Sequence, residues 1–153
     1  MSKGKDSVTR SQIREHIFKI IFTKDFIEEE RAPEQISLYL DNLTDDDGNA
    51  IILNDEDRDY IADKSAKILE SVGEIDEVIN KNSKGWSTSR IGKAELAILR
   101  VAVYEILFDE NIPDNVAINE AVELAKSYGE ADAPAFINGI LAAVKPKDSG
   151  AKD

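Results

Sequence analysis

Residues 89–110 are the stretch that most constrains how this chain can fold. Ile91, Ala94, Ile98 and Val101 recur at three- and four-residue intervals, which is the period of a helix. The other faces of this helix are also mostly apolar: Leu96, Ala97, Leu99, Val103, Ile106, Leu107 and Phe108. A helix that is apolar on nearly every side must be covered by other elements. Charged residues interrupt it at Lys93, Glu95, Arg100 and Glu105, so it is not a membrane span. We predict the central, buried helix of an all-α bundle.

Length and composition narrow the class of protein. A chain of 153 residues suggests one domain with a real core. Cysteine is absent, which excludes disulfides and thiolate metal sites and fits a reducing, cytoplasmic setting. No apolar run reaches spanning length, and the polar residues 1–6 lack the apolar core of a signal peptide. We therefore expect a soluble, intracellular protein without a membrane partner.

The charge is distributed unevenly along the chain. The net charge is −12, yet residues 1–24 contain six Lys or Arg against two acidic residues. Residues 25–63 contain fourteen Asp or Glu against Arg31 and Arg58. A local basic footprint on an acidic body allows nucleic-acid binding that the total charge alone would argue against.

The remaining periodicity predicts an all-α fold of about seven helices. We expect two small subdomains, about 7–83 and 84–144, between loose tails at 1–6 and 145–153. Gly73 and Gly129 are expected to end helices, Asp132 to cap the last one, and Trp86 to plug the core. The expected helices are about 7–28 (capped by Ser7 or Thr9), 33–42, 55–71, 74–82, 89–110, 115–128 and one that ends near 144.

The first helix carries a row of candidate contact residues. Arg10, Arg14, Phe18 and Phe22 repeat every four residues and so lie along one face. Two guanidinium groups followed by two rings could hold a phosphate backbone and stack bases. The alternative is that both rings are core residues and both arginines are merely solvated.

Arg100 is the most informative charge in the central helix. A buried guanidinium needs a carboxylate or carbonyl partner, because an unpaired buried charge is very costly. Glu120 and Glu123 are the candidates on the following helix. We expect the role of Arg100 to be structural.

The sequence argues against catalysis, a cofactor or a metal site. His16 is the only histidine, and neither a phosphate-binding glycine loop nor a nucleophile motif is present. Asp45, Asp47, Asn49 and Glu56 have the spacing of a calcium-binding loop, but Ala50 stands where the turn needs glycine. We interpret this segment as a solvated acidic loop, with calcium binding as a minor alternative.

Three blocks of sequence carry a resemblance to a known family: residues 86–106, residues 113–129 and the Phe-x-Asn-Gly motif at Phe136 to Gly139. Together with the Arg14-Glu15 pair they resemble the NusB family of transcription antitermination proteins. The resemblance is strong from 86 to 144 and weak across the acidic middle.

The resemblance implies an all-helical fold of two small subdomains and binding of boxA RNA together with NusE, a ribosomal small-subunit protein. This complex loads onto RNA polymerase and suppresses termination on ribosomal RNA operons. The residues implied in RNA binding are Lys3, Lys5, Arg10, Arg14, Phe22, Phe136 and Asn138. Glu95 is implied in binding NusE, and Gly139 has a structural place in its motif. The chain has fewer arginines at its start than many relatives, which predicts weaker RNA binding without the partner.

A rival hypothesis is an acidic protein–protein adaptor that makes no direct RNA contact. The sequence leaves the oligomeric state open, including self-association.

Overall fold

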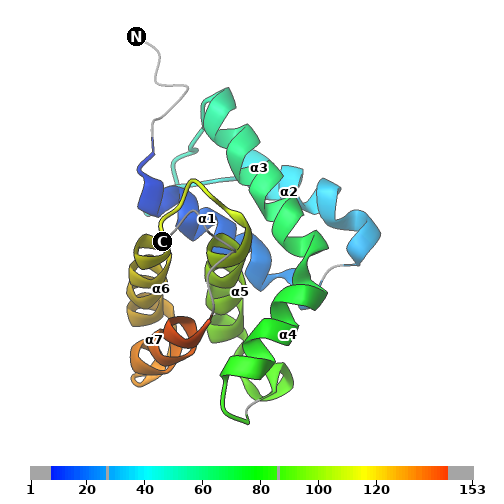
Figure 1. The fold of residues 1–153 in the computed structure, drawn as a ribbon. Coiled ribbons are helices and arrows are strands. Elements are labelled where there is room, and N and C mark those ends of the chain that lie inside the picture. Colours follow the sequence, from blue (N-terminus) through cyan, green and yellow to red (C-terminus); the bar gives the residue numbers. More distant parts are fainter. Residues whose placement is uncertain (1–7, 27, 86, 145–153) are drawn as a thin grey trace. The chain divides into compact units, whose positions relative to one another are not determined.

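The computed structural model describes residues 8–26, 28–85 and 87–144. These residues contain seven α-helices and no strand, which confirms the predicted all-α class (Figure 1). No helix in the described ranges is long and apolar enough to cross a membrane. The chain divides into two compact units, residues 1–69 and 70–153. The helices are α1 Arg10–Phe22, α2 Ala32–Asp41, α3 Asp55–Glu70, α4 Val72–Asn82, α5 Lys93–Phe108, α6 Asp114–Tyr128 and α7 Ala133–Ala143.

Helix α1 of the first unit is shorter than predicted. Thr9 is its cap: Gln12 N donates to Thr9 Oγ1 at 3.0 Å, and Thr9 N donates to Gln12 Oε1 at 2.8 Å. This reciprocal pair satisfies two backbone N–H donors at the helix start. The helix ends at Phe22 because the hydroxyl of Thr23 donates to the carbonyl of Ile20 at 2.7 Å, a local bond that competes with helix continuation. The predicted extension toward residue 28 is replaced by the 3-10 turns Lys24–Phe26 and Glu29–Arg31.

The acidic loop after α2 is held by hydrogen bonds to the Asp45 carboxylate. Asp45 accepts hydrogen bonds from Asp47 N and Asn49 N, both at 2.9 Å, and an isolated bridge pairs Thr44 with Ala50. These backbone donors, that of Asn49 first, lower the pKa of Asp45. Gly48 turns the chain with φ +85°, a conformation that suits glycine. Asp45 thus serves as a turn-forming residue, and the described residues contain no acidic or histidine cluster arranged to hold a metal.

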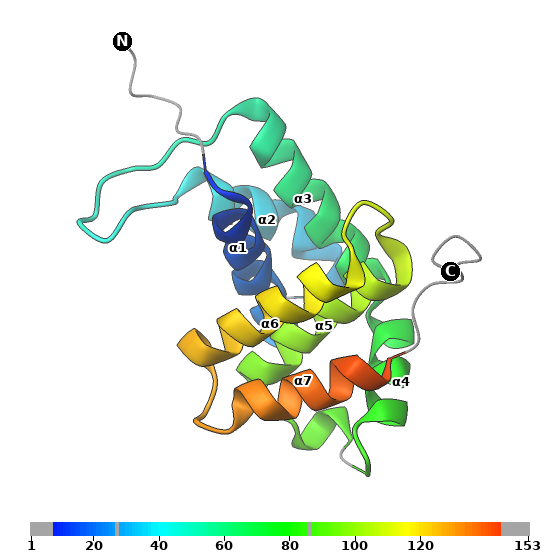
Figure 2. The ribbon, with the colours of Figure 1, turned by 60° about the vertical axis from the view of Figure 1, so that its left-hand side comes forward.

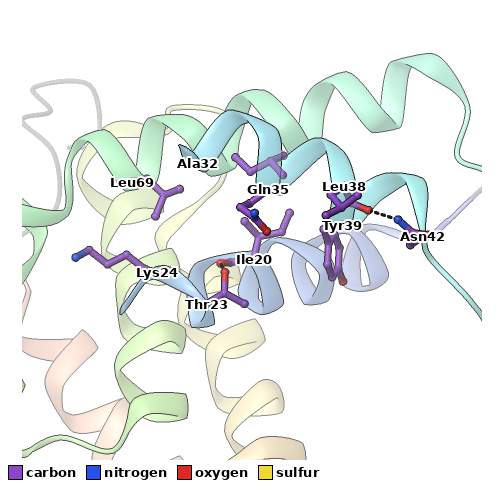
Figure 3. Close-up of a pocket in the computed structure, with 10 residues that line it drawn as sticks. Ile20, Thr23, Lys24, Ala32, Gln35, Leu38, Tyr39, Asn42 and Leu69 are labelled. Atoms are coloured by element: carbon purple, nitrogen blue, oxygen red, sulfur yellow. Dashed lines mark hydrogen bonds between the residues drawn. The ribbon is translucent and has the colours of Figure 1, made fainter. Parts of the chain in front are cut away.

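The first unit encloses a hollow between α1 and α2. Ile20 and Ile36 are almost fully buried and form part of its apolar lining, together with Leu69 at the end of α3 (Figure 3). The hollow has a volume of about 470 Å³. Its polar lining comes from α2 and its C-cap and from the turn that follows α1: Thr23, Lys24, Gln35, Tyr39 and Asn42.

The second unit begins at α4, earlier than the predicted boundary near residue 83. Gly73 does not end α3 as predicted: α3 stops at Glu70, and Gly73 lies in the first turn of α4. Helix α4 packs on α5 and α7, with Ile75 and Ile79 completely buried. This packing explains why α4 belongs to the second unit. Trp86, the predicted core plug, lies outside the described residues.

Helix α5 is the buried centre of the second unit, as predicted, but it spans Lys93–Phe108 and not 89–110. Gly92 caps it, and a separate 3-10 turn, Thr88–Arg90, precedes it. All residues from Leu96 to Val103 are buried. The helix therefore needs neighbours on most sides, and α4, α6 and α7 all pack on it.

Small residues let α6 approach its neighbours closely. Ala117, Ala121 and Ala125 are almost completely buried and recur every four residues along one face. This face packs within the α5, α6 and α7 group, which lies side by side in Figure 2. Tyr128, the last residue of α6, is 37% exposed.

Gly129 ends α6, as predicted, for a steric reason. Its φ is −101°, so no left-handed conformation is required. A Cβ at this position would lie 2.5 Å from Ala133 Cβ and 3.0 Å from both Ala125 O and Glu95 Oε2. Asp132 stands at the predicted cap of α7 but makes no side-chain capping bond. Gly129 is therefore needed for the close approach of the α6–α7 connection to α5.

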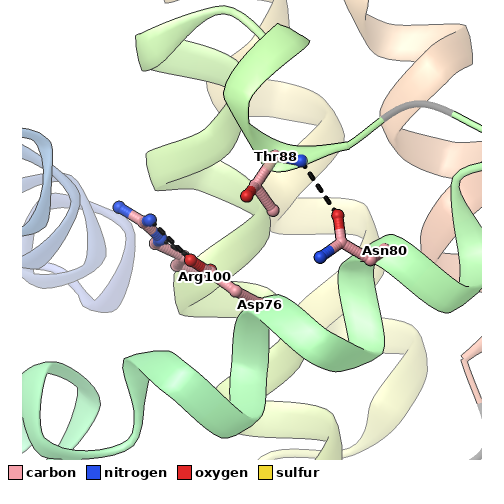
Figure 4. A network of polar contacts seen from close by, with 4 residues as sticks. All are labelled: Asp76, Asn80, Thr88 and Arg100. Carbon is pink, nitrogen blue, oxygen red and sulfur yellow. Dashed lines mark hydrogen bonds and ion pairs between the residues drawn. The ribbon is translucent and has the colours of Figure 1, made fainter.

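The carboxylate partner of Arg100 is Asp76 on α4, and the predicted partners Glu120 and Glu123 on α6 were wrong (Figure 4). Arg100 Nε donates to Asp76 Oδ1 at 2.9 Å, and Nη2 donates to Oδ2 at 2.8 Å. The Arg100 side chain is only 7% exposed. Such a two-point bond satisfies the buried guanidinium and fixes its direction.

Removing the Asp76 carboxylate should destabilise the second unit strongly. Asp76→Asn leaves the Arg100 charge buried without a counter-ion, and we expect a loss of about 3 kcal/mol in unfolding free energy. Urea unfolding followed by circular dichroism measures this loss. Glu123→Gln is the control, because Glu123 only forms an exposed pair with Lys126 and should change stability by less than about 0.5 kcal/mol.

Two glycines should respond in opposite ways to alanine. Gly129→Ala forces a methyl group against Ala133 and should cost about 1–3 kcal/mol. Gly139 lies inside α7, where an added Cβ meets nothing within 4 Å, so Gly139→Ala should stabilise by about 0.5–1 kcal/mol. The two melting temperatures test this contrast. Destabilisation by Gly139→Ala would restore the structural role expected from the sequence.

Candidate nucleic-acid interface

The predicted row on α1 is divided between core and surface. Phe18 is 3% exposed and Arg14 is 8% exposed, whereas Phe22 is 38% exposed and Arg10 is exposed. Neither sequence interpretation fits the whole row, because one ring and one arginine are buried. A period of four residues drifts around a helix of 3.6 residues per turn, and the local packing decides which residues it covers.

Arg10 is the residue of this row best suited to meet a phosphate group. It lies in the first turn of α1 and has no ion pair among the described residues. Lys19 on the same helix is also exposed, but Glu15 lies 3.8 Å from its ammonium group. Arg14 has polar contacts of its own. Lys3 and Lys5 lie outside the described residues.

Phe22 belongs to an aromatic series that runs from the core to the surface. The ring centroids of Phe18 and Phe22 are 6.2 Å apart, and those of Phe22 and Phe26 are 6.3 Å apart. Both distances are within the range of favourable aromatic contacts. Phe26 is 69% exposed, and the sequence analysis did not single it out. Exposed rings of this kind can stack on unpaired bases.

The other predicted contact residues lie in the second unit. Phe136 is half-buried and Asn138 is exposed, and both belong to α7. Residues two positions apart on a helix point in different directions, so the two side chains do not form one contact point. The amide of Asn138 is available to solvent, whereas Phe136 has contacts of its own.

Glu95, the predicted partner-binding residue, forms a hydrogen bond within the protein. Its Oε2 atom accepts a hydrogen bond from the backbone N–H of Glu130 at 3.0 Å, just after α6. This bond holds the α6–α7 connection against the first turn of α5. A contact between Glu95 and another protein stays a prediction.

His16 forms a pair with Tyr39 that the sequence did not indicate. His16 Nδ1 and the Tyr39 hydroxyl are 2.9 Å apart, and the rings meet edge to face. Burial lowers the pKa of His16, the nearby Lys19 lowers it further, and Glu15 opposes them. The neutral imidazole is therefore favoured, and the pair fixes the Tyr39 ring on α2 against α1.

Comparison with known proteins identifies the family. The sequence profile of the NusB family matches residues 11–146. The chain belongs to the NusB family. A relative named transcription antitermination protein NusB, from Agathobacter rectalis, is 47% identical over 135 residues, covering 88% of this chain and 98% of the relative.

Solved structures support the NusB fold. The structure of T. maritima NusB superposes with a TM-score of 0.76 at 28% identity, over 91% of this chain and 92% of that chain. A chain from the crystal structure of a plectonemic RNA supercoil superposes with a TM-score of 0.67 at 26% identity, over 89% of this chain and 94% of that chain. The predicted NusB resemblance is confirmed.

The lowered pKa of His16 predicts a pH-dependent stability. The unfolded chain binds a proton at His16 more readily than the folded protein, so this contribution is present above about pH 6.5 and is lost as the pH falls below it. His16→Gln should remove this part of the slope between pH 8 and pH 5. Urea unfolding at several pH values measures it. Tyr39→Phe, which keeps the histidine, should retain the slope, and equal slopes for wild type and His16→Gln would contradict the assignment.

Proposed function

We propose that this protein is a non-catalytic antitermination factor of the cytoplasm. It binds boxA RNA together with the ribosomal protein that acts as NusE, joins the RNA polymerase antitermination complex and suppresses premature termination on ribosomal RNA operons. Membership of the NusB family supports this proposal, since the relatives are named transcription antitermination proteins. The structural observation that carries it is the exposed Arg10, which has no ion pair among the described residues and lies in a segment of net positive charge on an otherwise acidic chain.

In this proposal the RNA backbone is held by the amino-terminal segment. Arg10, with Lys3 and Lys5 before it, meets phosphate oxygens, which supply most of the affinity through counter-ion release. Arg14 is largely buried, so it supports α1 and contributes less to direct contact than the sequence suggests. Because the chain has few arginines at its start, RNA binding by this protein alone should be weak and strengthened by the partner.

Base recognition is assigned to aromatic and amide groups. Phe22 offers a partly exposed ring for stacking, and Asn138 offers an amide that can bond a base edge. Phe136, two residues before Asn138, is half-buried and helps to hold α7 in place. Glu95 is proposed to contact NusE through the oxygen that does not accept from Glu130. The free protein could also self-associate into a homo-oligomer.

A second candidate function is that of an acidic adaptor without RNA contact. The burial of Arg14 and the fourteen acidic residues between positions 25 and 63 favour it. In that case the ribosomal partner would be captured equally well with and without RNA, and no residue of 1–24 would cross-link to RNA.

Replacing Arg10 should weaken RNA binding through one lost phosphate contact. We expect Arg10→Ala to reduce the affinity for boxA RNA about fivefold to tenfold at moderate salt and to reduce the salt slope by about one. Fluorescence anisotropy with labelled RNA, with and without the ribosomal partner, measures both quantities.

Arg31→Ala is the matched control for this experiment. Arg31 is also exposed, but its Nε atom lies 3.6 Å from Glu34 Oε1. Arg31→Ala should therefore leave the salt slope of RNA binding unchanged. If Arg10→Ala and wild type bind RNA with the same affinity and slope, the α1 surface does not hold the backbone.

A further inference from the structure

The segment that joins α4 to α5 carries a concentration of positive charge in the second unit. Residues 78–94 contain four basic residues and no Asp or Glu, in a chain whose net charge is −12. All four are exposed: Lys81, Lys84, Arg90 and Lys93. We call these four residues the α4–α5 basic surface. A local excess of positive charge attracts a polyanion whatever the sign of the total charge.

A hydrogen bond brings the two halves of this segment together. Thr88 N donates to Asn80 Oδ1 at 2.9 Å, so the 3-10 turn Thr88–Arg90 lies against the end of α4 (Figure 4). Lys81 directly follows Asn80 in the last turn of α4, and Arg90 closes the 3-10 turn. The cations on both sides of the connection therefore lie at the same end of the second unit.

The carboxylates that flank this stretch in sequence do not neutralise it. Asp76 is bonded to Arg100 through both of its oxygens, and Glu95 accepts from Glu130 N at 3.0 Å. Glu77 is exposed and forms no ion pair among the described residues. Helix α7, which packs on α4, contains no charged residue. The positive charge of the α4–α5 basic surface is thus left without a nearby acidic helix.

Lys81 and Lys84 are the members of this surface without an ion pair in the described ranges. Lys84 has φ +54°, and Gly85 follows it with φ +94°. A left-handed backbone favours glycine or asparagine, because other side chains are crowded there. The chain nevertheless has a lysine at this position of the turn. A residue that the backbone does not favour points to a use for its charge.

The chemistry of this surface fits a nucleic-acid backbone better than a protein. Ser87 and Ser89 are exposed, with their hydroxyls 2.8 Å apart, and add neutral donors beside the cations. Phosphate oxygens accept hydrogen bonds from lysine, arginine and serine side chains, whatever the base. Protein interfaces instead depend on large apolar or aromatic anchors. Among its described residues, the segment 78–94 exposes no large apolar side chain.

We propose that the α4–α5 basic surface binds the phosphate backbone of single-stranded RNA, in addition to the contact made by Arg10. The proposal rests on the proposed function for the identity of the RNA. Phosphate contacts carry no sequence information, so this surface adds affinity and leaves the choice of sequence to other residues. Lys81 and Lys84 are the two cations assigned to direct phosphate contact.

The test removes both charges and keeps the local backbone. Lys81→Gln retains a good helix former, and Lys84→Asn introduces a residue that tolerates the left-handed turn. In fluorescence anisotropy with labelled boxA RNA, the double variant should bind about tenfold more weakly at moderate salt. Its salt slope should fall by about 1.4, because each phosphate contact to a single strand contributes about 0.7. Thermal unfolding by circular dichroism verifies that the variant is folded.

Lys67→Gln combined with Lys126→Gln is the matched control. It removes the same total charge from two exposed lysines that already lie 3.1 Å from Asp63 and Glu123. This control should bind RNA with the affinity and slope of wild type, so it separates a lost contact from a change in net charge. The loss caused by the Lys81 and Lys84 substitutions should add to that of Arg10→Ala, because the contacts are independent.

An oligouridine of the same length separates this proposal from the proposed function. If boxA RNA binds no better than oligouridine, but the double variant weakens both, the proposed function fails and the phosphate-binding surface stands. If Arg10→Ala weakens boxA binding and the double variant matches wild type with both RNAs, the α4–α5 assignment is wrong and the proposed function stands. A double variant that retains RNA binding but no longer captures a protein partner also overturns the assignment to RNA. Absence of binding to either RNA overturns both.

Discussion

The second unit depends on how the charge of Arg100 is satisfied inside an apolar helix. The guanidinium is almost fully buried, and the two-point bond with Asp76 offsets the cost of removing it from water. That bond selects α4 as a neighbour of α5 and fixes their register. A second polar link, from Thr88 N to Asn80 Oδ1 at 2.9 Å, ties the turn before α5 to the same helix (Figure 4). The apolar packing around α5 is non-directional, so these bonds supply the specificity.

Close packing on the other side of α5 depends on small residues. The alanine face of α6 and the missing side chain of Gly129 let the α6–α7 connection reach Glu95. Glu95 then satisfies the Glu130 amide, a backbone donor left free after α6 ends. The family resemblance pointed to Glu95 as a partner contact, and the structure adds an internal function. A residue with both roles would link partner binding to the order of this connection.

The acidic character of the chain does not oppose RNA binding everywhere. Several acidic groups are used locally: Asp45 forms its own turn, and Asp41 and Asp76 bond to arginines. The amino-terminal segment keeps a net positive charge, and Arg10 remains exposed at the start of α1. A local field of this kind decides where a phosphate backbone can approach, because salt screens charges that lie more than about 10 Å away.

The sequence by itself determined the all-α class, the central helix, most helix positions and the family, because helical periodicity and local motifs are short-range signals. It also predicted that Gly129 ends a helix and that Arg100 has a structural role, but it named the wrong carboxylate partners for Arg100. Only the tertiary structure decided that Asp76 is the partner of Arg100, that Arg14 and Phe18 are buried while Arg10 and Phe22 are exposed, and that α4 joins the second unit. The hollow beside Tyr39 and Gln35 was likewise invisible in the sequence. Each of these features depends on which helix faces meet, and a pattern within one helix does not specify its neighbour.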